Sequence, residues 1–302
     1  MQRYQKMVRD LVSDIKLLNR VNVHIKDKTR VNEILGKIVE GGFKQLQIVS
    51  DFDQTITKQH ENGKKHLSSF GIFRCCPSLP KEHVELTDSF ARKYKPIECD
   101  LTIPIEERKK HMEEWYSDTE KSLKGIEISP EEISDIAKKY GPCLRDGCKK
   151  IFQSLEEKNV PVLVFSAGLG DTVVALLKHN GIYRTNVKVV SNFLDFDKNN
   201  VVQGFQGKLI HIYSKNEHAL EGTDYFKLIS QRNNVILLGD SIGDAGMADG
   251  LPNTNAVLKI GFLYFEKDLA EKKLSDYLNY FDIVLEDDQT MDVLGSILAL
   301  LE

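Results

Sequence analysis

The hydrophobic pattern along the chain alternates between two periods. Short apolar runs rich in Val, Ile and Leu predict buried strands, whereas segments with apolar residues three or four positions apart predict helices. The expected strands span 46–50, 160–165, 187–192, 235–238, 256–260 and 283–285. The expected helices of the same pattern span 7–18, 27–42, 145–158, 171–180 and 222–232. Strands that alternate with helices predict an α/β fold with a doubly wound parallel sheet.

One long segment interrupts this alternation. Residues 61–145 contain no convincing buried strand, but they show helical patterns over 81–95, 104–117 and 130–140, punctuated by prolines. We therefore expect a helical cap inserted after the first strand, with 1–60 and 146–302 forming the α/β core. A cap at this place can close over the strand ends and select the substrate. Asn199-Asn200 lies between two short apolar segments, which predicts a β-hairpin laid on the sheet.

Composition and charge narrow the possible classes of protein. The 302 residues carry a net charge of −4, so nothing points to a nucleic acid polymer as partner. The five cysteines lack the spacing of a zinc site and favour free thiols in a reducing compartment. The N-terminal segment contains no apolar stretch long enough for a signal peptide or a membrane span. We expect a cytoplasmic protein that is a monomer and has no membrane partner.

Two acidic residues follow the first long strand. In the segment LQIVSDFDQTIT, the apolar run ends at Asp51 and Asp53, which one residue separates. Two carboxylates this close repel each other unless a cation lies between them, so the pair suggests a Mg²⁺ site. The alternative is a turn in which one of these carboxylates caps a backbone amide.

Functional residue types also follow two later strands. Ser166, with the amides of Ala167 and Gly168, comes after one of them, and Asp240-Ser241-Ile242-Gly243-Asp244 comes after another. Lys215 lies between these segments in the sequence. In an open α/β sheet, the carboxyl ends of the strands meet at one crevice, so we expect these residues to converge.

This set of side chains suits phosphoryl transfer. Ser166 and the neighbouring amides can donate to phosphate oxygens, Lys215 can neutralise charge, and Asp240 can complete a metal shell of oxygen ligands. A carboxylate of Asp51 or Asp53 can attack phosphorus and form an aspartyl-phosphate. Each element alone has a simpler interpretation: Ser166 as a helix N-cap, Lys215 as a solvated side chain, and the glycine-rich segment as a turn. Their joint order is more specific.

The order of these motifs resembles that of a known superfamily. Asp51-x-Asp53-x-Thr55, Ser166, Lys215 and Gly239-Asp240-Ser241-x-x-Asp244 are similar to the four motifs of the haloacid dehalogenase phosphohydrolases. The similarity extends to the cytosolic 5'-nucleotidase III (pyrimidine 5'-nucleotidase) family, including its 7-methylguanosine phosphate-specific members. The segments KYKPIECD, EEWYSDT, NVKVVSNFLDFD and YFDIVLEDDQTMDV are among those that carry it.

The resemblance implies a role for each matching position in the core. Asp51 corresponds to the nucleophile, and Asp53 corresponds to the general acid and base, whose backbone carbonyl also binds Mg²⁺. Asp240 corresponds to the third metal ligand, and Lys215 to the lysine that neutralises phosphate and nucleophile. The remaining implied roles belong to Ser166 and Ala167 (phosphate binding), Asp244 (orienting Lys215 or the water shell of the metal) and Thr55 (bracing the loop).

The resemblance also implies that the cap recognises the base. Glu98 lies where the family has its base-recognising glutamate, and Thr119 lies where it has a serine that contacts the nucleotide. Trp115, the only tryptophan, can stack on a base or pack in the cap. The expected activity is Mg²⁺-dependent hydrolysis of nucleoside 5'-monophosphates, namely 7-methyl-GMP, CMP or UMP. The alternatives are phosphatase activity on another small phosphomonoester, transfer of the phosphoryl group to a nucleoside, and nucleotide binding without catalysis.

Overall fold

The fold is built on one mixed sheet. The computed structural model describes residues 9–141, 143–215, 229, 231–249, 254–264 and 273–302. Within this part, seven strands pair in the order β1-β11-β10-β9-β2-β5-β6, and only the pairing of β1 with β11 is antiparallel. The strands are β1 (Val23–His24), β2 (Leu46–Ser50), β5 (Val162–Leu169), β6 (Val187–Asn192), β9 (Asn234–Gly239), β10 (Ala256–Leu263) and β11 (Ile283–Glu286). The predicted α/β fold with a mainly parallel sheet is confirmed.

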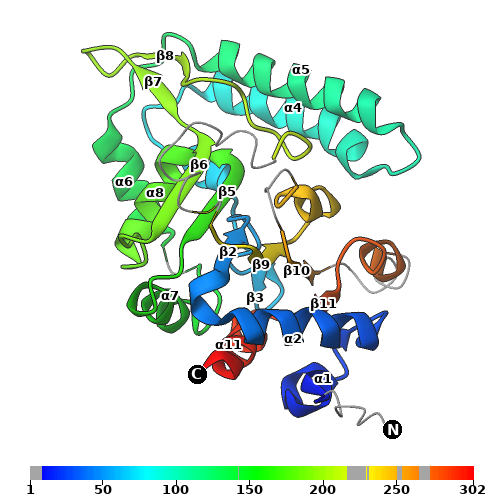
Figure 1. Ribbon diagram of the computed structural model, residues 1–302. Helices are drawn as coiled ribbons and strands as arrows, with labels where there is room; N and C mark the ends of the chain where they lie inside the picture. The colour runs from blue at the N-terminus through cyan, green and yellow to red at the C-terminus, as the bar shows by residue number, and fades with distance from the viewer. Residues whose placement is uncertain (1–8, 142, 216–228, 230, 250–253, 265–272) are drawn as a thin grey trace, which may run out of the picture.

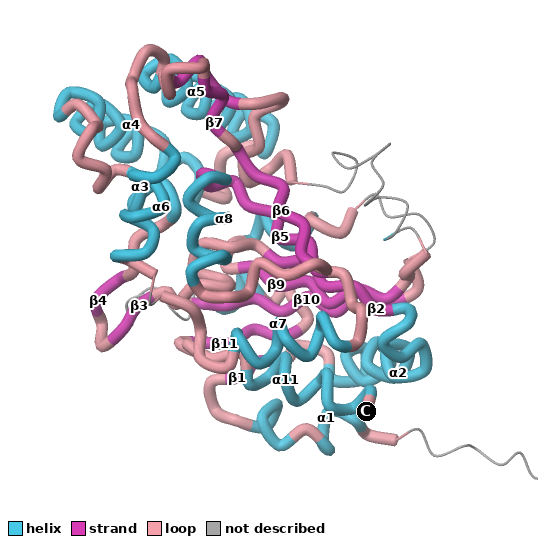
Figure 2. Tube along the Cα trace, turned by 90° about the vertical axis from the view of Figure 1, so that its left-hand side faces the viewer, coloured by secondary structure: helices cyan, strands magenta, loops and turns pink. Residues whose placement is uncertain are grey.

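Helical segments cover both faces of the sheet. The core helices are α1 (Leu11–Asp14), η1 (Lys16–Asn19), α2 (Lys28–Gln45), α7 (Cys148–Glu157), α8 (Gly170–His179), η3 (Ile242–Gly246), α11 (Asp292–Leu298) and η4 (Ala299–Leu301). One hydrophobic cluster joins the sheet to α1, α2, α7, α8 and α11, and Figure 2 shows α2, α7 and α11 along this face. A second cluster joins the opposite face to η3 and to apolar residues of 274–281. The sheet is therefore doubly wound, as predicted.

The segment after β2 forms a mainly helical cap. A short hairpin, β3 (His60–Glu61) and β4 (Lys64–Lys65), precedes α3 (Ser69–Phe73), α4 (Lys81–Cys99), α5 (Ile105–Leu123) and α6 (Pro130–Lys139). In Figure 1, α4 and α5 lie side by side beyond the carboxyl ends of the strands, at the opposite end of the molecule from α11. The cap therefore stands over the edge of the sheet where the sequence places its candidate chemistry.

A second hairpin lies on the cap rather than on the sheet. The predicted hairpin forms from β7 (Leu194–Phe196) and β8 (Val202–Phe205), but it forms its own two-stranded sheet. Val202 exchanges backbone hydrogen bonds with Gly125 (2.9 Å) and Ile126 (2.9 Å), just after α5. Leu194, Val202 and Phe205 complete a third hydrophobic cluster with residues of the cap. The predicted position on the sheet was wrong because the apolar face of this hairpin fills the cap instead.

Several predicted boundaries differ from those observed. The N-terminal helix is limited to α1 and the short η1, and residues 1–8 lie outside the described part. Helical structure continues past Gly41 to Gln45, although Gly42 leaves helical geometry (φ 56°, ψ −169°). Pro96 does not end α4, and β5 continues through the Ser-Ala-Gly segment to Leu169 because Leu169 pairs with Asn192 of β6. The predicted helix over 222–232 lies mostly outside the described residues. Among those described, no helix is long and apolar enough to cross a membrane.

Candidate active site

The candidate residues of the core meet at the carboxyl edge of the sheet. Strand β2 lies between β5 and β9. The loop after β2 carries Asp51 and Asp53, the loop after β9 carries Asp240, and Ser166 lies in the last part of β5. The order of connections changes side at β2, and this is where open α/β sheets form their binding crevice. The convergence expected from the sequence is present in the structure.

Lys215 joins two of the acidic loops. Its Nζ lies 2.5 Å from Oδ1 of Asp51 and 2.9 Å from Oδ1 of Asp244, and only 5 % of the residue is exposed. Burial disfavours its charge, but the neighbouring charges of Asp244 and Asp51 outweigh this effect and raise the pKa of the ammonium. Lys215 therefore stays charged, and it neutralises the carboxylate that the sequence assigns as nucleophile.

Three acidic groups at this edge form a cluster that could hold a cation. Carboxylate oxygens of Asp51, Asp240 and Asp244 all lie within 4.8 Å of one another. Burial, with the charges of nearby acids, raises the pKa of Asp51 to about 7 despite Lys215, and burial together with the charge of Asp51 raises the pKa of Asp240. One ammonium does not balance these carboxylates, and oxygen ligands in such a set fit a divalent metal ion.

Asp244 is already engaged by protein groups. Its Oδ2 accepts hydrogen bonds from the backbone N–H of Ser241 at 3.0 Å and from Oγ of Ser241 at 3.0 Å, while Oδ1 accepts from Lys215. A Cβ at Gly239 would lie 2.4 Å from the Cβ of Asp244, so the close approach of this loop requires glycine. Asp244 thus holds Lys215 and the start of its own loop, and its predicted orienting role stays a prediction.

Asp53 faces away from the acidic cluster and toward the cap. Its Oδ1 accepts from the backbone N–H of Ser69 at 2.7 Å, and its Oδ2 accepts from Oγ of Ser69 at 2.6 Å. Burial raises the pKa of this carboxyl group, although the hydrogen bonds from Ser69 oppose the shift. Ser69 holds the carboxylate of Asp53. Asp53 can therefore contribute to a metal site only through its backbone carbonyl, which is the group that the family resemblance implies.

The end of β5 is held in place from three sides. Oγ of Ser166 accepts from the N–H of Gly168 at 3.0 Å, and Oγ of Ser69 accepts from the N–H of Leu169 at 3.1 Å. The backbone carbonyl of Ala167 accepts from Tyr116 Oη of the cap at 2.9 Å and from Nδ2 of Asn192 at 3.0 Å. A Cβ at Gly168 would lie 2.0 Å from Oγ of Ser69, so a side chain there would displace Ser69 from Asp53.

The loop of Asp240 is fixed by contacts from two other segments. Thr55 Oγ1 donates to Oδ1 of Asp240 at 3.3 Å, and Tyr277 Oη donates to the backbone carbonyl of Asp240 at 2.6 Å. Thr55 thus links the loop after β2 to the loop after β9, and its bracing role in catalysis stays a prediction.

The cap residues predicted to bind the base lie on α4 and α5. Glu98 is partly buried. Burial raises the pKa of its carboxyl group, the negative charge of Asp244 adds to this shift, and the positive charge of Lys215 opposes it. Trp115 stacks on Tyr94 with ring centroids 5.8 Å apart and an interplanar angle of 15°. Oγ1 of Thr119 donates within α5 to the carbonyl of Trp115 at 2.9 Å. The proposed contacts of these three residues with a base stay predictions.

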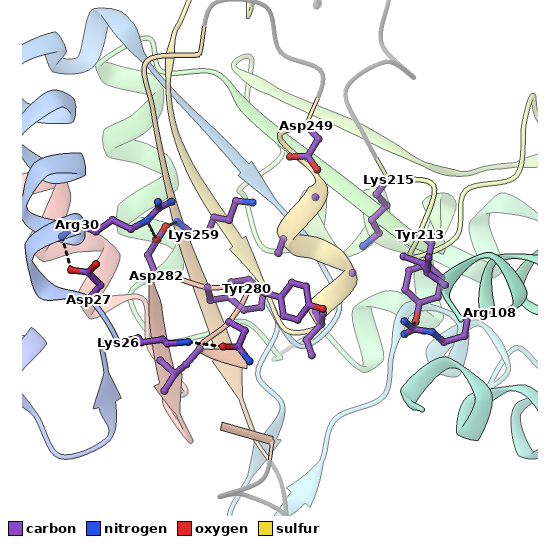
Figure 3. Close-up of a pocket in the computed structure, with 18 of the residues that line it drawn as sticks. Lys26, Asp27, Arg30, Arg108, Tyr213, Lys215, Asp249, Lys259, Tyr280 and Asp282 are labelled. Carbon is purple, nitrogen blue, oxygen red and sulfur yellow. Dashed lines mark hydrogen bonds and ion pairs between the residues drawn. The ribbon is translucent and has the colours of Figure 1, made fainter. Parts of the chain in front are cut away.

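A large cavity opens beside Lys215. It has a volume of about 950 Å³, and Lys215, Tyr213 and Arg108 lie on one side of it (Figure 3). Arg108 Nη1 donates to Tyr213 Oη at 2.7 Å, and Tyr213 Oη donates to the carbonyl of Glu98 at 2.7 Å. This chain of contacts connects α4 and α5 to the loop that carries Lys215.

Sequence reasoning missed several residues that position the site. Ser69 and Arg145 lie at the two ends of the cap, and Tyr277 and Asn192 bind backbone carbonyls from outside the motifs. Their types and spacing contain no signal of a site, since each acts through a contact that exists only in the folded chain.

The comparisons with known proteins agree with this geometry. Residues 54–302 match the family model described as Pyrimidine 5'-nucleotidase (UMPH-1). The 7-methylguanosine phosphate-specific 5'-nucleotidase of Drosophila melanogaster is 44% identical over 293 residues, which cover 96% of this chain and 91% of that protein. The protein of the same name from Homo sapiens is 36% identical over 288 residues, covering 95% of each.

Solved structures extend the comparison to the fold. A crystal structure of cytosolic 5'-nucleotidase IIIB bound to cytidine is 43% identical, covers 96% of both chains and has a TM-score of 0.88. A probable phosphoserine phosphatase from Vibrio cholerae, at 12% identity and a TM-score of 0.52, shares the fold alone. The expected haloacid dehalogenase-type fold is confirmed. The chain belongs to the pyrimidine 5'-nucleotidase (UMPH-1) family.

Proposed function

We propose that this protein is a Mg²⁺-dependent 5'-nucleotidase whose preferred substrate is 7-methylguanosine 5'-monophosphate, with CMP as a second substrate. One observation carries the proposal: the two neighbouring carboxylates have separate environments. Asp51 lies against Lys215 in the acidic cluster, while Asp53 is turned to Ser69. The names of the relatives from Drosophila melanogaster and Homo sapiens support the first substrate, and the cytidine in the solved relative supports the second.

The separation of the two carboxylates assigns them different steps. Asp51 attacks the phosphorus atom and forms an aspartyl-phosphate, while Asp53 donates its proton to the departing 5'-oxygen, so that this oxygen leaves as a neutral hydroxyl group. Asp53, now ionised, takes a proton from water, whose oxygen attacks the phosphorus. Phosphate leaves, and Asp51 and the proton of Asp53 are restored. The raised pKa of Asp53 favours the protonated form that the first step needs.

The core residues supply binding and charge for both steps. Ser166 and the backbone amide of Ala167 donate to phosphate oxygens, the N–H of Gly168 donates to Oγ of Ser166 and orients it, and Lys215 offsets the negative charge of the phosphate. Mg²⁺ would be held by Asp51, Asp240 and the carbonyl of Asp53, and when bound it neutralises charge that develops on the phosphate. The mutual repulsion of the buried acids supports this assignment.

The proposal for the base rests on Glu98. Its carboxylate can accept hydrogen bonds from an exocyclic amino group, and its charge favours the cationic 7-methylguanine ring. Trp115 offers a second contact by stacking and Thr119 a third through its hydroxyl, which can still accept a hydrogen bond.

We also propose that the protein is a cytoplasmic monomer. The name of the solved relative, cytosolic 5'-nucleotidase IIIB, supports the proposed location.

The proposal for Glu98 is tested by its replacement. In Glu98→Ala, we expect kcat/KM for 7-methyl-GMP to fall by about 100-fold, because a charged hydrogen bond contributes roughly 1.5–3 kcal/mol. The rate with p-nitrophenyl phosphate, which has no base, should stay near that of the wild type. Equal losses for both substrates would remove Glu98 from base recognition.

The function itself is tested by a substrate panel. We would compare kcat/KM for 7-methyl-GMP, CMP, UMP, GMP and phosphoserine, with Mg²⁺ and with EDTA, and with an added nucleoside acceptor. The expected order places 7-methyl-GMP first and CMP second, with no turnover in EDTA. Highest activity on phosphoserine, or formation of a new nucleotide rather than phosphate, would replace the proposed function with another.

A further inference from the structure

Arg145 is a buried cation at the point where the cap returns to the core. It is 1 % exposed, and it is the largest of the fully buried side chains in the described part of the chain. Its Nε donates to the carbonyl of Thr55 at 2.6 Å, its Nη2 to the carbonyl of Gln54 at 2.6 Å, and its Nη1 to the carbonyl of Asp288. The guanidinium also lies 3.8 Å from the ring centroid of Phe262.

The partners of Arg145 are unusual for a buried charge. Within the described residues, no carboxylate forms an ion pair with it, and its hydrogen bonds go to backbone carbonyls. Burial lowers the pKa of Arg145 to about 10. A buried guanidinium is costly unless its donors are well satisfied, and a planar fork of donors can hold several acceptors at fixed angles. The cost indicates that the geometry of those carbonyls matters.

The two carbonyls from the loop after β2 belong to the residues that follow Asp53. Gln54 has a φ of 64°, in the left-handed region that non-glycine residues seldom adopt. Its N–H is held by Thr57 Oγ1 at 2.7 Å and its carbonyl by Arg145, so both ends of this strained residue are fixed. The backbone turns at Gln54, directly after Asp53. The carboxylate of Asp53 accepts a hydrogen bond from Ser69.

Arg145 therefore closes a ring of contacts around the loop. Ser69, where the chain enters the cap, holds the side chain of Asp53, and Arg145, where the chain leaves the cap, holds the backbone just after it. Thr55 also reaches Asp240 with its hydroxyl. Neither Ser69 nor Arg145 lies within the four motifs named above.

We propose that Arg145 is a positioning residue for proton transfer by Asp53. It fixes the backbone of Gln54 and Thr55, and so keeps the Asp53 carboxyl group on the line between Ser69 and the leaving oxygen. This inference rests on the proposed function, since it uses the roles assigned to Asp51 and Asp53. Lysine cannot replace Arg145, because one ammonium cannot span three carbonyls in a plane.

The structure offers a matched control at the other end of β2. Arg232 also donates to three backbone carbonyls, those of Phe43 (2.8 Å), Leu46 (2.9 Å) and Asn159 (2.8 Å). In R145K, kcat for 7-methyl-GMP per folded molecule should fall about 100-fold, which is the cost of a misplaced catalytic group, with KM nearly unchanged. In R232K, kcat should stay within about twofold of the wild type, since its carbonyls lie far from the chemistry. Equal loss of kcat in the two variants, or a wild-type kcat in R145K, would overturn the proposal.

A pre-steady-state measurement separates positioning from general damage. The p-nitrophenolate leaving group needs no proton, so Asp51 can be phosphorylated without help from Asp53. R145K should therefore keep the burst of p-nitrophenolate at wild-type amplitude and lose the steady-state rate that follows it, because water must still be deprotonated. A burst lost in parallel with the steady state contradicts the proposal. If R145K does not fold, R145Q replaces it in both measurements.

The two hypotheses fail in different ways. If the wild type does not hydrolyse any nucleotide but still shows the burst with p-nitrophenyl phosphate, the proposed function fails and the test of Arg145 stands. If the wild type hydrolyses 7-methyl-GMP and R145K does so equally well, only the role of Arg145 fails.

Discussion

The two ends of the parallel sheet use similar parts and differ in charge. At each end of β2, one arginine donates to three backbone carbonyls: Arg145 beyond the carboxyl end and Arg232 at the amino end. At the carboxyl end, Asp51 and Asp240 lie close together. At the amino end, the buried polar residues of β2 and β9 are the neutral Gln47 and Asn234.

The neutral end pairs most of its polar groups with nearby protein atoms, although Oε1 of Gln47 has no hydrogen-bond partner within the described part of the chain. Asn234, which is fully buried, donates through Nδ2 to the carbonyl of Lys37 at 3.1 Å and accepts from Nδ2 of Asn255 at 3.0 Å. Gln47 Nε2 donates to the carbonyl of Arg232 at 3.0 Å. These amides carry no charge, and the cation of Arg232 at this end donates to backbone carbonyls.

The charged end holds groups that oppose folding when no cation is bound. The pKa of Asp51 is raised because burial and neighbouring carboxylates make its ionised form unfavourable. Strain of this kind persists only where the surrounding structure enforces it, and it collects at functional sites. One scaffold thus keeps a stable end and a reactive end, and charge rather than shape distinguishes them.

The largest expected effect comes from removing the charge at Asp51. In Asp51→Asn, phosphate release from 7-methyl-GMP should fall by about 10⁴-fold or more, because the nucleophile is lost. A colorimetric assay for phosphate measures it. Asp195, exposed on β7, supplies the control, and Asp195→Asn should keep wild-type turnover. Turnover that survives in Asp51→Asn would end the assignment of Asp51 and with it the chemical distinction between the two ends.

The next effect comes from placing a charge at the neutral end. Asn234→Asp buries a carboxylate where Asn234 now exchanges amide hydrogen bonds, and we expect a loss of about 3 kcal/mol in the free energy of unfolding. Urea denaturation measures this change. The kcat per folded molecule should stay unchanged, since the residue lies at the amino end of β9. A fall in kcat with unchanged stability would show that the two ends are not independent.

The smallest effect is a pH dependence of stability without metal. Because the folded pKa of Asp51, about 7, lies above its ordinary value of 3.8, the folded protein binds this proton more tightly than the unfolded chain does. Stability due to this group is therefore present at low pH and is lost as pH rises between about 4 and about 7.

Urea denaturation in EDTA at pH 5 and pH 7.5 checks this dependence. The wild type should lose on the order of 1 kcal/mol more than Asp51→Asn over this interval, and added Mg²⁺ should reduce the difference. The same pH dependence in both proteins would show that Asp51 does not carry the strain. Asp195→Asn should behave like the wild type.

The positions of the motif residues at the reactive end could be predicted from the sequence more completely than the contacts that surround them. Asp51, Ser166 and Asp240 follow apolar runs, and the geometry of a parallel sheet brings such positions together whatever their distance in sequence. The convergence of the core motifs could therefore be predicted from periodicity and order. The base contacts of Glu98, Trp115 and Thr119 stay predictions.

Other features depend on contacts that no local pattern records. Ser69 lies in a polar segment and Arg145 lies between two helices, and both act through hydrogen bonds to residues distant in the sequence. Strand β1 has two residues, too few to show a period. Pro96 was expected to end α4, and the helix continues to Cys99 because tertiary packing overrides a local preference.

The position of the β7–β8 hairpin limits how the cap can be exchanged between proteins. Residues 61–145 alone lack Leu194, Val202 and Phe205, which fill the hydrophobic cluster of the cap. A chimaera that transplants only this segment to another phosphatase would expose that cluster to water. We expect successful grafts to carry two pieces of chain, so that substrate specificity in this architecture is inherited as a discontinuous module.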